Sequence, residues 1–489
     1  MNKVKITGGP KLTDYESYAS LATTVRGYKK ECEEDIPFFE DKTIWMINST
    51  ETGGGVAEML PSQIRIMREQ GLKVEWLVME TNDEHFFELT KQVHNAIHGS
   101  GTFSFTDDDY EVYNRVNKSN AESAKKFIKD GDIVVIHDPQ PAGMIKYLNQ
   151  SFNITSIWRC HIGLEERNKA THEAWEFMKP ILSHFNHFVF SIPAYVPDFI
   201  KENYTIIPPS IDPLSHKNRT LQLHKCIGIL HQSGIINEKE PVIYNFYKHQ
   251  VKRVKPDGTF GKAKEPEELD IIYRPTILQV SRWDKLKGFK QVLEAFIKLK
   301  ENIDQYRHDT IHYKRIEKSR LILAGPDPDF VKDDPEGKEV LEELIDIYTS
   351  KAKKYQKDIA ILLLPMDDPK QNALIVNALQ RSSSIIVQNS LQEGFGLTAT
   401  EAMWKQVPII VSNAAGLKYQ VEHEINGMII DDATDIDLLS NALNKMLFQP
   451  KVREKWGFNG QIRVIEHFTV FSQLKRWLSL FAKLSSERS

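Results

Sequence analysis

The sequence predicts an α/β protein made of two doubly wound domains with parallel sheets. Short apolar runs alternate with amphipathic segments along the chain, a pattern typical of parallel strands covered by helices on both faces. The chain has 489 residues, whereas single hydrophobic cores stop growing at about 250–300 residues. Three prolines within 208–213 indicate a break between domains, because proline interrupts both helices and central strands.

The expected strands are taken in chain order. In the first half they are Thr43–Asn48, Val74–Met79, Asp132–Ile136, Thr155–Arg159 and His187–Ser191. In the second half they are Thr276–Val280, Arg320–Ala324, Ala360–Leu364, Ser384–Gln388 and Pro408–Val411. Each is a short apolar or β-branched run followed by a helical pattern, which favours parallel pairing.

These elements define the expected domains. The first covers residues 1–235 and the second 236–465, and a final helix within 466–489 is expected to pack back onto the first domain. The Lys-, Gly- and Glu-rich stretch 247–268 is expected to be a solvated surface insertion. We expect Glu301–Ser319 to form an extended connection between a helix and a strand.

Composition narrows the class of protein. The chain is 41% hydrophobic and 27% charged, as in globular proteins, and no apolar run approaches the roughly 18 residues that span a bilayer. The start of the chain has no secretory h-region, so a soluble cytoplasmic protein is expected. The net charge of −4 argues against bulk attraction to nucleic acid or anionic membranes. Three distant cysteines are too few for a disulfide framework.

The clearest chemical signal is a glycine-rich turn between Glu393 and Glu401, directly after an expected strand. Gly394 and Gly396 allow the backbone to approach a ligand closely. A helix that begins near Leu397 would direct free N–H groups and a positive dipole end at an anion. The two carboxylates can accept hydrogen bonds from hydroxyls, and a nucleotide sugar carries diols at both ends. This combination predicts a nucleotide-sugar site.

A basic loop follows the strand Thr276–Val280. Ligands of open α/β sheets bind beyond the carboxyl ends of the strands, so Arg282 and Lys287 are placed to meet a diphosphate. Their charges suit a departing diphosphate. On its own, the same loop could be an ordinary basic surface segment.

Three glycines, Gly53, Gly54 and Gly55, follow the first of these strands. Their spacing matches neither the dinucleotide fingerprint nor a P-loop. We expect them to face the acceptor and the donor phosphates, although a plain tight turn would also explain them.

Polar residues end two further first-domain strands: His137, Asp138 and Gln140 after one, and Arg159 and His161 at the other. Side chains at these positions are expected to line a ligand site. A lone histidine is more often structural than catalytic, so this assignment depends on position. No His, Cys or Asp spacing indicates a metal held by the protein.

With these residues in view, the chain resembles glycosyltransferase family 4, and within it the trehalose glycosyltransferring synthases and the retaining trehalose phosphorylases. The motifs that carry the resemblance are Asn48–Leu60, Phe86–Asn95, His137–Ala142, Trp158–Ile162, Pro208–Ser215, Gln279–Arg282, Asp334–Gly337, Val376–Ala378 and Glu393–Lys405. The second-domain motifs are those of nucleotide-sugar transfer in general. The first-domain motifs are narrower and point to trehalose chemistry.

The resemblance implies a GT-B fold, with two Rossmann-like domains facing across a cleft, and a role for each motif residue. Arg282, Lys287, Glu393 and His161 form the implied catalytic set. The implied donor ligands are Gly54, Gly55, Arg282, Lys287, Met366, Glu393, Gly394, Phe395, Gly396, Leu397 and, for the ribose, Glu401. The implied acceptor ligands are Gly53, Gly54, His137, Asp138, Gln140 and Arg159. One departure is Asn413–Gly416, where members of the family carry two glycines.

The resemblance further implies synthesis of α,α-trehalose from a nucleoside diphosphate glucose and glucose, with retention of configuration. Phosphorolysis of trehalose, another acceptor, and a non-catalytic sugar-nucleotide sensor are the alternatives. No cofactor is expected beyond the nucleotide sugar as co-substrate. Any Mg²⁺ is expected to bind loosely to the nucleotide. Small sugars are the expected partners, with no nucleic acid or membrane, and a homodimer is one compatible assembly. The nucleobase stays open, since its recognition after Ala360–Leu364 would rely on backbone contacts.

Overall fold

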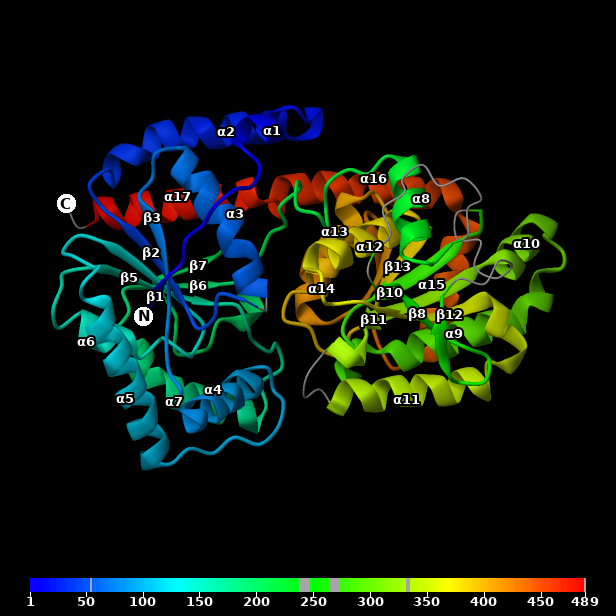
Figure 1. Cartoon of the computed structure of the whole chain (residues 1–489), viewed down its shortest axis with the longest axis horizontal. Helices are drawn as coiled ribbons and strands as arrows, with labels where there is room; N and C mark the ends of the chain where they lie inside the picture. The colour runs from blue at the N-terminus through cyan, green and yellow to red at the C-terminus, as the bar shows by residue number, and fades with distance from the viewer. Residues whose placement is uncertain (53–54, 237–246, 248, 264–272, 331–334, 488–489) are drawn as a thin grey trace. The chain divides into compact units, whose positions relative to one another are not determined.

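The computed structural model describes residues 1–52, 55–236, 247, 249–263, 273–330 and 335–487. They form two compact units, shown in Figure 1: Met1–Asp212 with Ile465–Ser489, and Pro213–Val464. Each unit contains one mainly parallel sheet with helices on both of its faces. The predicted class, two doubly wound α/β domains, is confirmed.

The first sheet has the order β1-β3-β2-β4-β5-β6-β7. Its strands are β1 (Asn2–Lys3), β2 (Ile44–Asn48), β3 (Val74–Val78), β4 (Ile133–His137), β5 (Thr155–Cys160), β6 (His187–Phe190) and β7 (Tyr204–Ile206). All of them are parallel except β1, which runs antiparallel to β3. The central strands β2, β4 and β5 are buried along their whole length, which explains their continuous apolar runs.

The helices of this unit are α1 (Leu12–Glu16), α2 (Ala19–Asp35), α3 (Gly55–Glu69), α4 (Glu84–Ile97), α5 (Asp107–Ala124), α6 (Met144–Leu148), α7 (Lys169–Leu182) and α17 (Val470–Ser486). Figure 1 shows α2, α3 and α17 on one side of the sheet and α4, α5 and α7 on the other. The C-terminal helix α17 packs against α2, and Phe471 contacts the rings of Tyr15 and Tyr28.

The second sheet has the order β15-β14-β13-β10-β11-β12-β8-β9. Its strands are β8 (Lys252–Val254), β9 (Phe260–Lys262), β10 (Thr276–Val280), β11 (Arg320–Pro326), β12 (Ile359–Leu364), β13 (Ile385–Gln388), β14 (Ile409–Ser412) and β15 (Gly427–Ile430). The strands from β10 to β15 are parallel. The strands β8 and β9 form an antiparallel hairpin that extends the sheet beyond β12, the last of the parallel strands.

That hairpin corrects the expectation of a solvated loop over 247–268. Arg253 and Val254 are buried, and an Arg253 Nη2 donates to the carbonyl of Ile359 at 3.0 Å. The charged composition concealed a strand that covers the edge of the sheet, a position where strands tolerate Lys and Arg. Residues 248 and 264–268 of the predicted insertion lie outside the described part of the chain.

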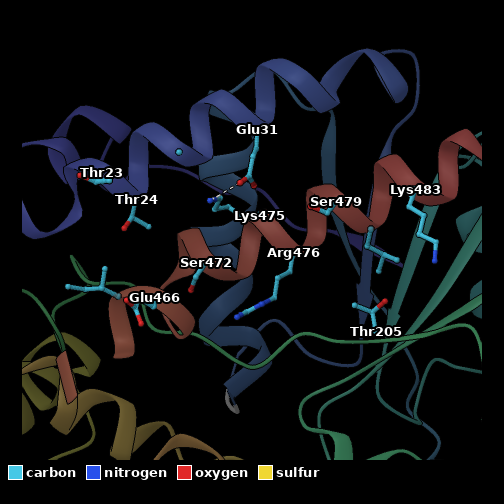
Figure 2. Close-up of a pocket in the computed structure, with 13 residues that line it drawn as sticks. Thr23, Thr24, Glu31, Thr205, Glu466, Ser472, Lys475, Arg476, Ser479 and Lys483 are labelled. Carbon is cyan, nitrogen blue, oxygen red and sulfur yellow. Dashed lines mark ion pairs between the residues drawn. The ribbon is translucent and has the colours of Figure 1, made fainter. Parts of the chain in front are cut away.

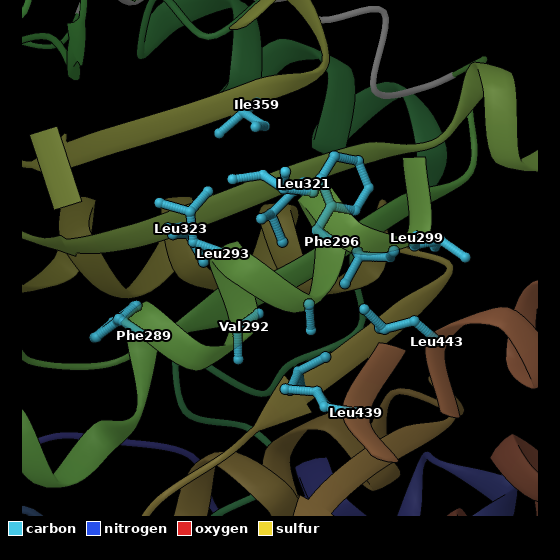
Figure 3. Close-up of a cluster of buried hydrophobic side chains, with 14 of the residues drawn as sticks. Phe289, Val292, Leu293, Phe296, Leu299, Leu321, Leu323, Ile359, Leu439 and Leu443 are labelled. Carbon is cyan, nitrogen blue, oxygen red and sulfur yellow. The ribbon is translucent and has the colours of Figure 1, made fainter. Parts of the chain in front are cut away.

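The helices of the second unit are α8 (Leu223–Gln232), α9 (Phe289–Glu301), α10 (Thr310–Lys318), α11 (Pro335–Thr349), α12 (Pro369–Arg381), α13 (Leu397–Trp404), α14 (Ala415–Gln420), α15 (Ile436–Phe448) and α16 (Pro450–His467), whose last residues belong to the first unit. Figure 3 shows the apolar face of α9, with Val292, Leu293 and Phe296, packed among Leu321 of β11 and Leu443 of α15.

One expected domain boundary and one expected connecting segment differ from the structure. The units divide after Asp212, earlier than the expected boundary at 235, because α8 packs on α12 of the second unit. The expected extended connection Glu301–Ser319 instead contains α10. The Asp309 side chain caps that helix by accepting from the amides of Ile311 and His312, and Ile316 is buried beneath it.

Candidate active site

The polar residues of the first unit meet at the carboxyl ends of β4 and β5, as predicted. His137 and Arg159 are partners in the parallel register of these strands. His137 Nδ1 and His161 Nε2 lie 3.1 Å apart, and the two rings are stacked, with 10° between their planes. Both histidines therefore belong to one hydrogen-bonded pair.

Asp138 holds this cluster in place. It adopts a left-handed backbone conformation, with φ of 62°. Its amide donates to the Arg159 carbonyl at 2.8 Å, its carbonyl accepts from Trp158 Nε1 at 3.0 Å, and its Oδ1 accepts from the His161 amide at 2.9 Å. Strain of this kind persists where surrounding contacts fix it, and it is frequent at functional sites.

Burial keeps both imidazoles neutral. Desolvation lowers the pKa of His137 to about 3 and that of His161 well below its usual value, with the nearby Arg159 adding to both shifts. Burial also raises the pKa of Asp138 to about 6 and lowers that of Arg159 to about 10. Neutral imidazoles can both donate to and accept from sugar hydroxyls.

Two buried nitrogens of this cluster have no partner. Among the described residues, neither His137 Nε2 nor Arg159 Nη1 takes part in a hydrogen bond. Unpaired buried polar atoms are costly and rare in proteins. Each of these atoms therefore has an unfilled hydrogen-bonding position among the described residues.

The remaining site residues predicted in the first unit are the three glycines 53–55 and Gln140. Gly55 begins α3, whereas Gly53 and Gly54 lie outside the described residues. The side chain of Gln140 is half-buried, and its carbonyl accepts from Asn117 Nδ2 at 3.2 Å. Gln140 thus lies just beyond the end of β4, where it was expected.

The basic loop of the second unit follows β10 and depends on Gly288. The side-chain Nε2 of Gln279 donates to the Lys287 carbonyl at 2.7 Å. Gly288 has φ of 63°, and a Cβ at this position would lie 2.1 Å from the carbonyl oxygen of Asn389. The close approach of this loop to Asn389, directly after β13, therefore requires glycine.

This approach brings the two strongest sequence signals together. Lys287 Nζ donates to Glu393 Oε2 at 2.8 Å, and both side chains are largely buried. Ser390 Oγ donates to the same carboxylate oxygen at 3.0 Å. Arg282 is 75% exposed, with Asp284 at 3.5 Å, so its guanidinium is accessible to a ligand. Ser390 was not predicted, and its position three residues before Glu393 is the signal that could have indicated it.

The glycine turn leads into α13 as predicted. Gly396 has φ of 80° and caps the helix that begins at Leu397. Phe395 is buried, and its carbonyl accepts from Gln420 Nε2 of α14. Helix α13 follows the carboxyl end of β13, and the free amides at the start of a helix suit a phosphate.

The unusual segment Asn413–Gly416 still supplies the glycine that the turn needs. A Cβ on Gly416 would lie 2.5 Å from the Cα of Phe395 and 2.6 Å from the Gly394 carbonyl. The close packing of α14 on the turn depends on glycine at this position and at Gly396, whose Cβ would lie 2.6 Å from Leu417 Cδ2. Alanine at 414 and 415 is therefore compatible with the predicted turn.

Glu401 lies one turn into α13 and is only 6% exposed. Its Oε1 lies 3.7 Å from Lys217 Nζ. Lys405, one turn further on, donates to the Glu401 carbonyl at 3.1 Å, and burial lowers the pKa of Lys405 to about 7 against the opposing charge of Glu401. Lys217 was not predicted. It lies just beyond the motif Pro208–Ser215, and only the fold brings it to α13.

Met366 follows β12 and is 41% exposed, and its sulfur accepts from Asn372 Nδ2 at 3.1 Å. The predicted nucleotide residues of the second unit thus follow β10, β12 and β13, three strands of one parallel sheet. Their carboxyl ends point the same way.

A separate hollow of about 770 Å³ lies on the first unit between α2 and α17 (Figure 2). Hydroxyl and charged side chains line it, and Lys475 forms an ion pair with Glu31 at 2.7 Å. It contains none of the predicted site residues.

Within the described ranges, no three His, Cys, Asp or Glu side chains are grouped as a metal site. The same part of the chain contains no helix long and apolar enough to cross a membrane.

The fold and the paired loops of the second unit define a GT-B glycosyltransferase. The family model for the N-terminal domain of trehalose synthase matches residues 46–197, and that for glycosyl transferases group 1 matches 262–463. A trehalose synthase of Pyrococcus horikoshii is 31% identical over 98% of this chain and 97% of its own. The chain belongs to the trehalose synthase family within glycosyltransferase family 4, and it is a hexosyltransferase.

The chain is also similar to a trehalose phosphorylase and to a solved structure with the same fold. A trehalose phosphorylase of Pleurotus sajor-caju is 25% identical over 79% of this chain and 50% of its own. A solved structure described as trehalose-6-phosphate from E. coli bound with UDP-2-fluoro glucose is 14% identical, covers 90% of this chain and 99% of that one, and superposes with a TM-score of 0.64. This last likeness concerns the fold.

Proposed function

We propose that the protein is a retaining transferase that makes α,α-trehalose from a nucleoside diphosphate glucose and glucose, in a reversible reaction. The observation that carries this proposal is the arrangement in the second unit. There Lys287 and Glu393 form a largely buried pair close to the start of α13, and Glu401 lies one turn into that helix. The names of the trehalose synthase relatives support trehalose as the product.

In this reaction the bond between the glucose C1 and the diphosphate oxygen breaks. A new bond forms from C1 to the anomeric hydroxyl oxygen of the acceptor glucose, on the same face. The proton of that hydroxyl passes to the departing diphosphate, so the products are trehalose and the nucleoside diphosphate. The protein orients the reactants and stabilises charge, and supplies no nucleophile.

Each cluster has a proposed role. Arg282, Lys287 and the first amides of α13 stabilise the diphosphate as its negative charge grows. Glu393 accepts from donor-sugar hydroxyls. Its ion pair with Lys287 at 2.8 Å favours this orienting role over attack on C1, because a paired carboxylate is a weaker nucleophile. Covalent double displacement is therefore the less favoured mechanism.

In the first unit, we assign the acceptor to the His137, Asp138 and Arg159 cluster, and contact with the donor sugar to His161. The buried nitrogens His137 Nε2 and Arg159 Nη1 would gain partners from sugar hydroxyls. The proposal includes no metal held by the protein, and Mg²⁺ would act only on the diphosphate.

Product analysis tests this proposal. The full chain is incubated with glucose and, separately, ADP-, UDP- and GDP-glucose, and the disaccharide is identified by chromatography and by NMR of its anomeric protons. We expect α,α-trehalose from at least one donor. A β-linked product would contradict retention, and hydrolysis without disaccharide from all three donors would contradict the transfer itself.

A further inference from the structure

The segment 216–219 is held against α12 by side chains of that helix. Asn377 Nδ2 donates to the carbonyls of His216, at 3.0 Å, and Arg219, at 2.9 Å. Arg381 Nη2 donates to the Asn218 carbonyl at 3.1 Å and to that of Arg219 at 3.3 Å. The backbone on both sides of residue 217 is therefore fixed to one helix.

The same segment is held a second time, by α13. Trp404 Nε1 donates to the Asn218 carbonyl at 2.9 Å, and Lys405 Nζ donates to Asn218 Oδ1 at 3.1 Å. Asn218 is 4% exposed and Lys405 is 7% exposed. A surface loop does not need so many buried polar bonds, which indicates that the position of this segment matters.

These contacts determine where Lys217 lies. Its Nζ is 3.7 Å from Glu401 Oε1, and the side chains of Lys217 and Glu401 are 32% and 8% exposed. An ion pair between two exposed, mobile side chains contributes little. Here one partner is buried and the backbone of the other is fixed, so less entropy is lost when they meet.

The Glu401 carboxylate is poorly satisfied by the protein. Among the described residues, none donates a hydrogen bond to its carboxylate oxygens. Lys217 forms an ion pair with it, and the buried Lys405, which donates to the Glu401 carbonyl, adds a second nearby positive charge. Buried carboxylates are normally both paired and hydrogen-bonded. Glu401 has the charge partner but still has room for hydroxyl donors from a ligand.

We propose that Lys217 is a positioning residue for Glu401. It balances the charge of the buried carboxylate and holds it where both oxygens can accept from the vicinal hydroxyls of the nucleotide ribose. This inference rests on the proposed function, because it presupposes a nucleotide donor. Lys217 acts through Glu401 and needs no contact with the ligand.

The test uses Lys217→Met, which removes the charge and keeps much of the length of the side chain. Dissociation constants are measured by titration calorimetry for the nucleoside diphosphate that wild type binds most tightly and for its 2′,3′-dideoxy analogue. We expect Lys217→Met to weaken the first by about tenfold, as when a charged hydrogen-bond system loses one member. The dideoxy analogue should bind wild type and variant equally.

Three further variants sharpen this test. In a Glu401→Gln background, Lys217→Met should cause no additional loss, because the two residues act as one unit. Lys217→Arg should retain most of the affinity. Lys225→Met, at an exposed position on α8, is the matched control and should bind as wild type does. Thermal melts check that every variant is folded.

Other outcomes would overturn the inference. An equal loss for the dideoxy analogue would mean that Lys217 contacts the diphosphate and does not act through Glu401. Unchanged binding of the parent nucleotide by Lys217→Met would remove the residue from the site. If wild type bound none of the adenosine, uridine and guanosine diphosphates, the proposed function would fail first, and this inference with it.

Discussion

Replacing Lys287 by alanine is expected to lower turnover by about two orders of magnitude or more, the usual effect of losing one preorganised charge-stabilising donor. Lys287 is largely buried and pairs with Glu393 at 2.8 Å. Its loss removes a cation from the diphosphate and removes the cation of the ion pair from the Glu393 carboxylate. Arg282→Ala should have a similar effect on turnover. It should affect stability less, since that side chain is 75% exposed.

The neighbouring Lys285 provides the matched control. It lies in the same loop, but it is 60% exposed and pairs with Glu339 at the surface. Lys285→Ala should keep turnover within about twofold of wild type, because surface ion pairs contribute little. The turnover of each variant and of wild type is measured by steady-state kinetics of trehalose synthesis. Near-normal turnover in both Lys287→Ala and Arg282→Ala would remove the basic loop from the mechanism.

Gly288→Ala is expected to destabilise the second unit and to abolish most activity. The residue has φ of 63°, and a Cβ would lie 2.1 Å from the Asn389 carbonyl oxygen. A left-handed conformation alone costs a non-glycine residue about 1–2 kcal/mol, and the backbone clash adds to this. We expect a loss of about 2–4 kcal/mol in the free energy of unfolding, measured by urea denaturation, together with a displaced Lys287.

Gly131→Ala separates the two causes. Gly131 also has positive φ, 85°, but nothing lies within 4 Å of its added Cβ. It should therefore show only the conformational cost, about 1–2 kcal/mol, and keep its activity. If both variants lost the same stability and Gly288→Ala kept full turnover, the close approach of the two loops would not be needed for the site.

The sequence was informative where local pattern and tertiary structure agree. Buried parallel strands are apolar on both faces, so their positions could be read directly, and motif residues at their ends follow. Arg282, Lys287 and Glu393 were predicted in this way, and the fold brings the last two into contact.

Sequence reasoning failed where tertiary contacts override composition. The hairpin β8–β9 is rich in charge and glycine, yet it pairs with β12 and buries Arg253. Helix α10 lies in a polar segment, and it depends on the Asp309 cap and the burial of Ile316.

Lys217 is a second kind of residue that the sequence did not indicate, because its place near Glu401 depends on tertiary contacts. It follows no predicted strand, and neither charge pattern nor helical spacing links it to Glu401. Only the hydrogen bonds from α12 and α13 to its neighbours reveal the link.

The nature of the leaving group is the central claim, and one comparison tests it most directly. The breakdown of trehalose is followed in two parallel assays, one with the preferred nucleoside diphosphate and one with inorganic phosphate at equal concentration. Both assays are run with wild type and with Glu401→Ala. Glu401 can hold a ribose only when the co-substrate is a nucleotide. Removing the Glu401 carboxylate should therefore cost about 1–3 kcal/mol in the assay with the nucleoside diphosphate. We predict faster loss with the nucleoside diphosphate, and slower loss in the variant. Faster loss with inorganic phosphate, insensitive to Glu401→Ala, would contradict the account and identify a phosphorylase.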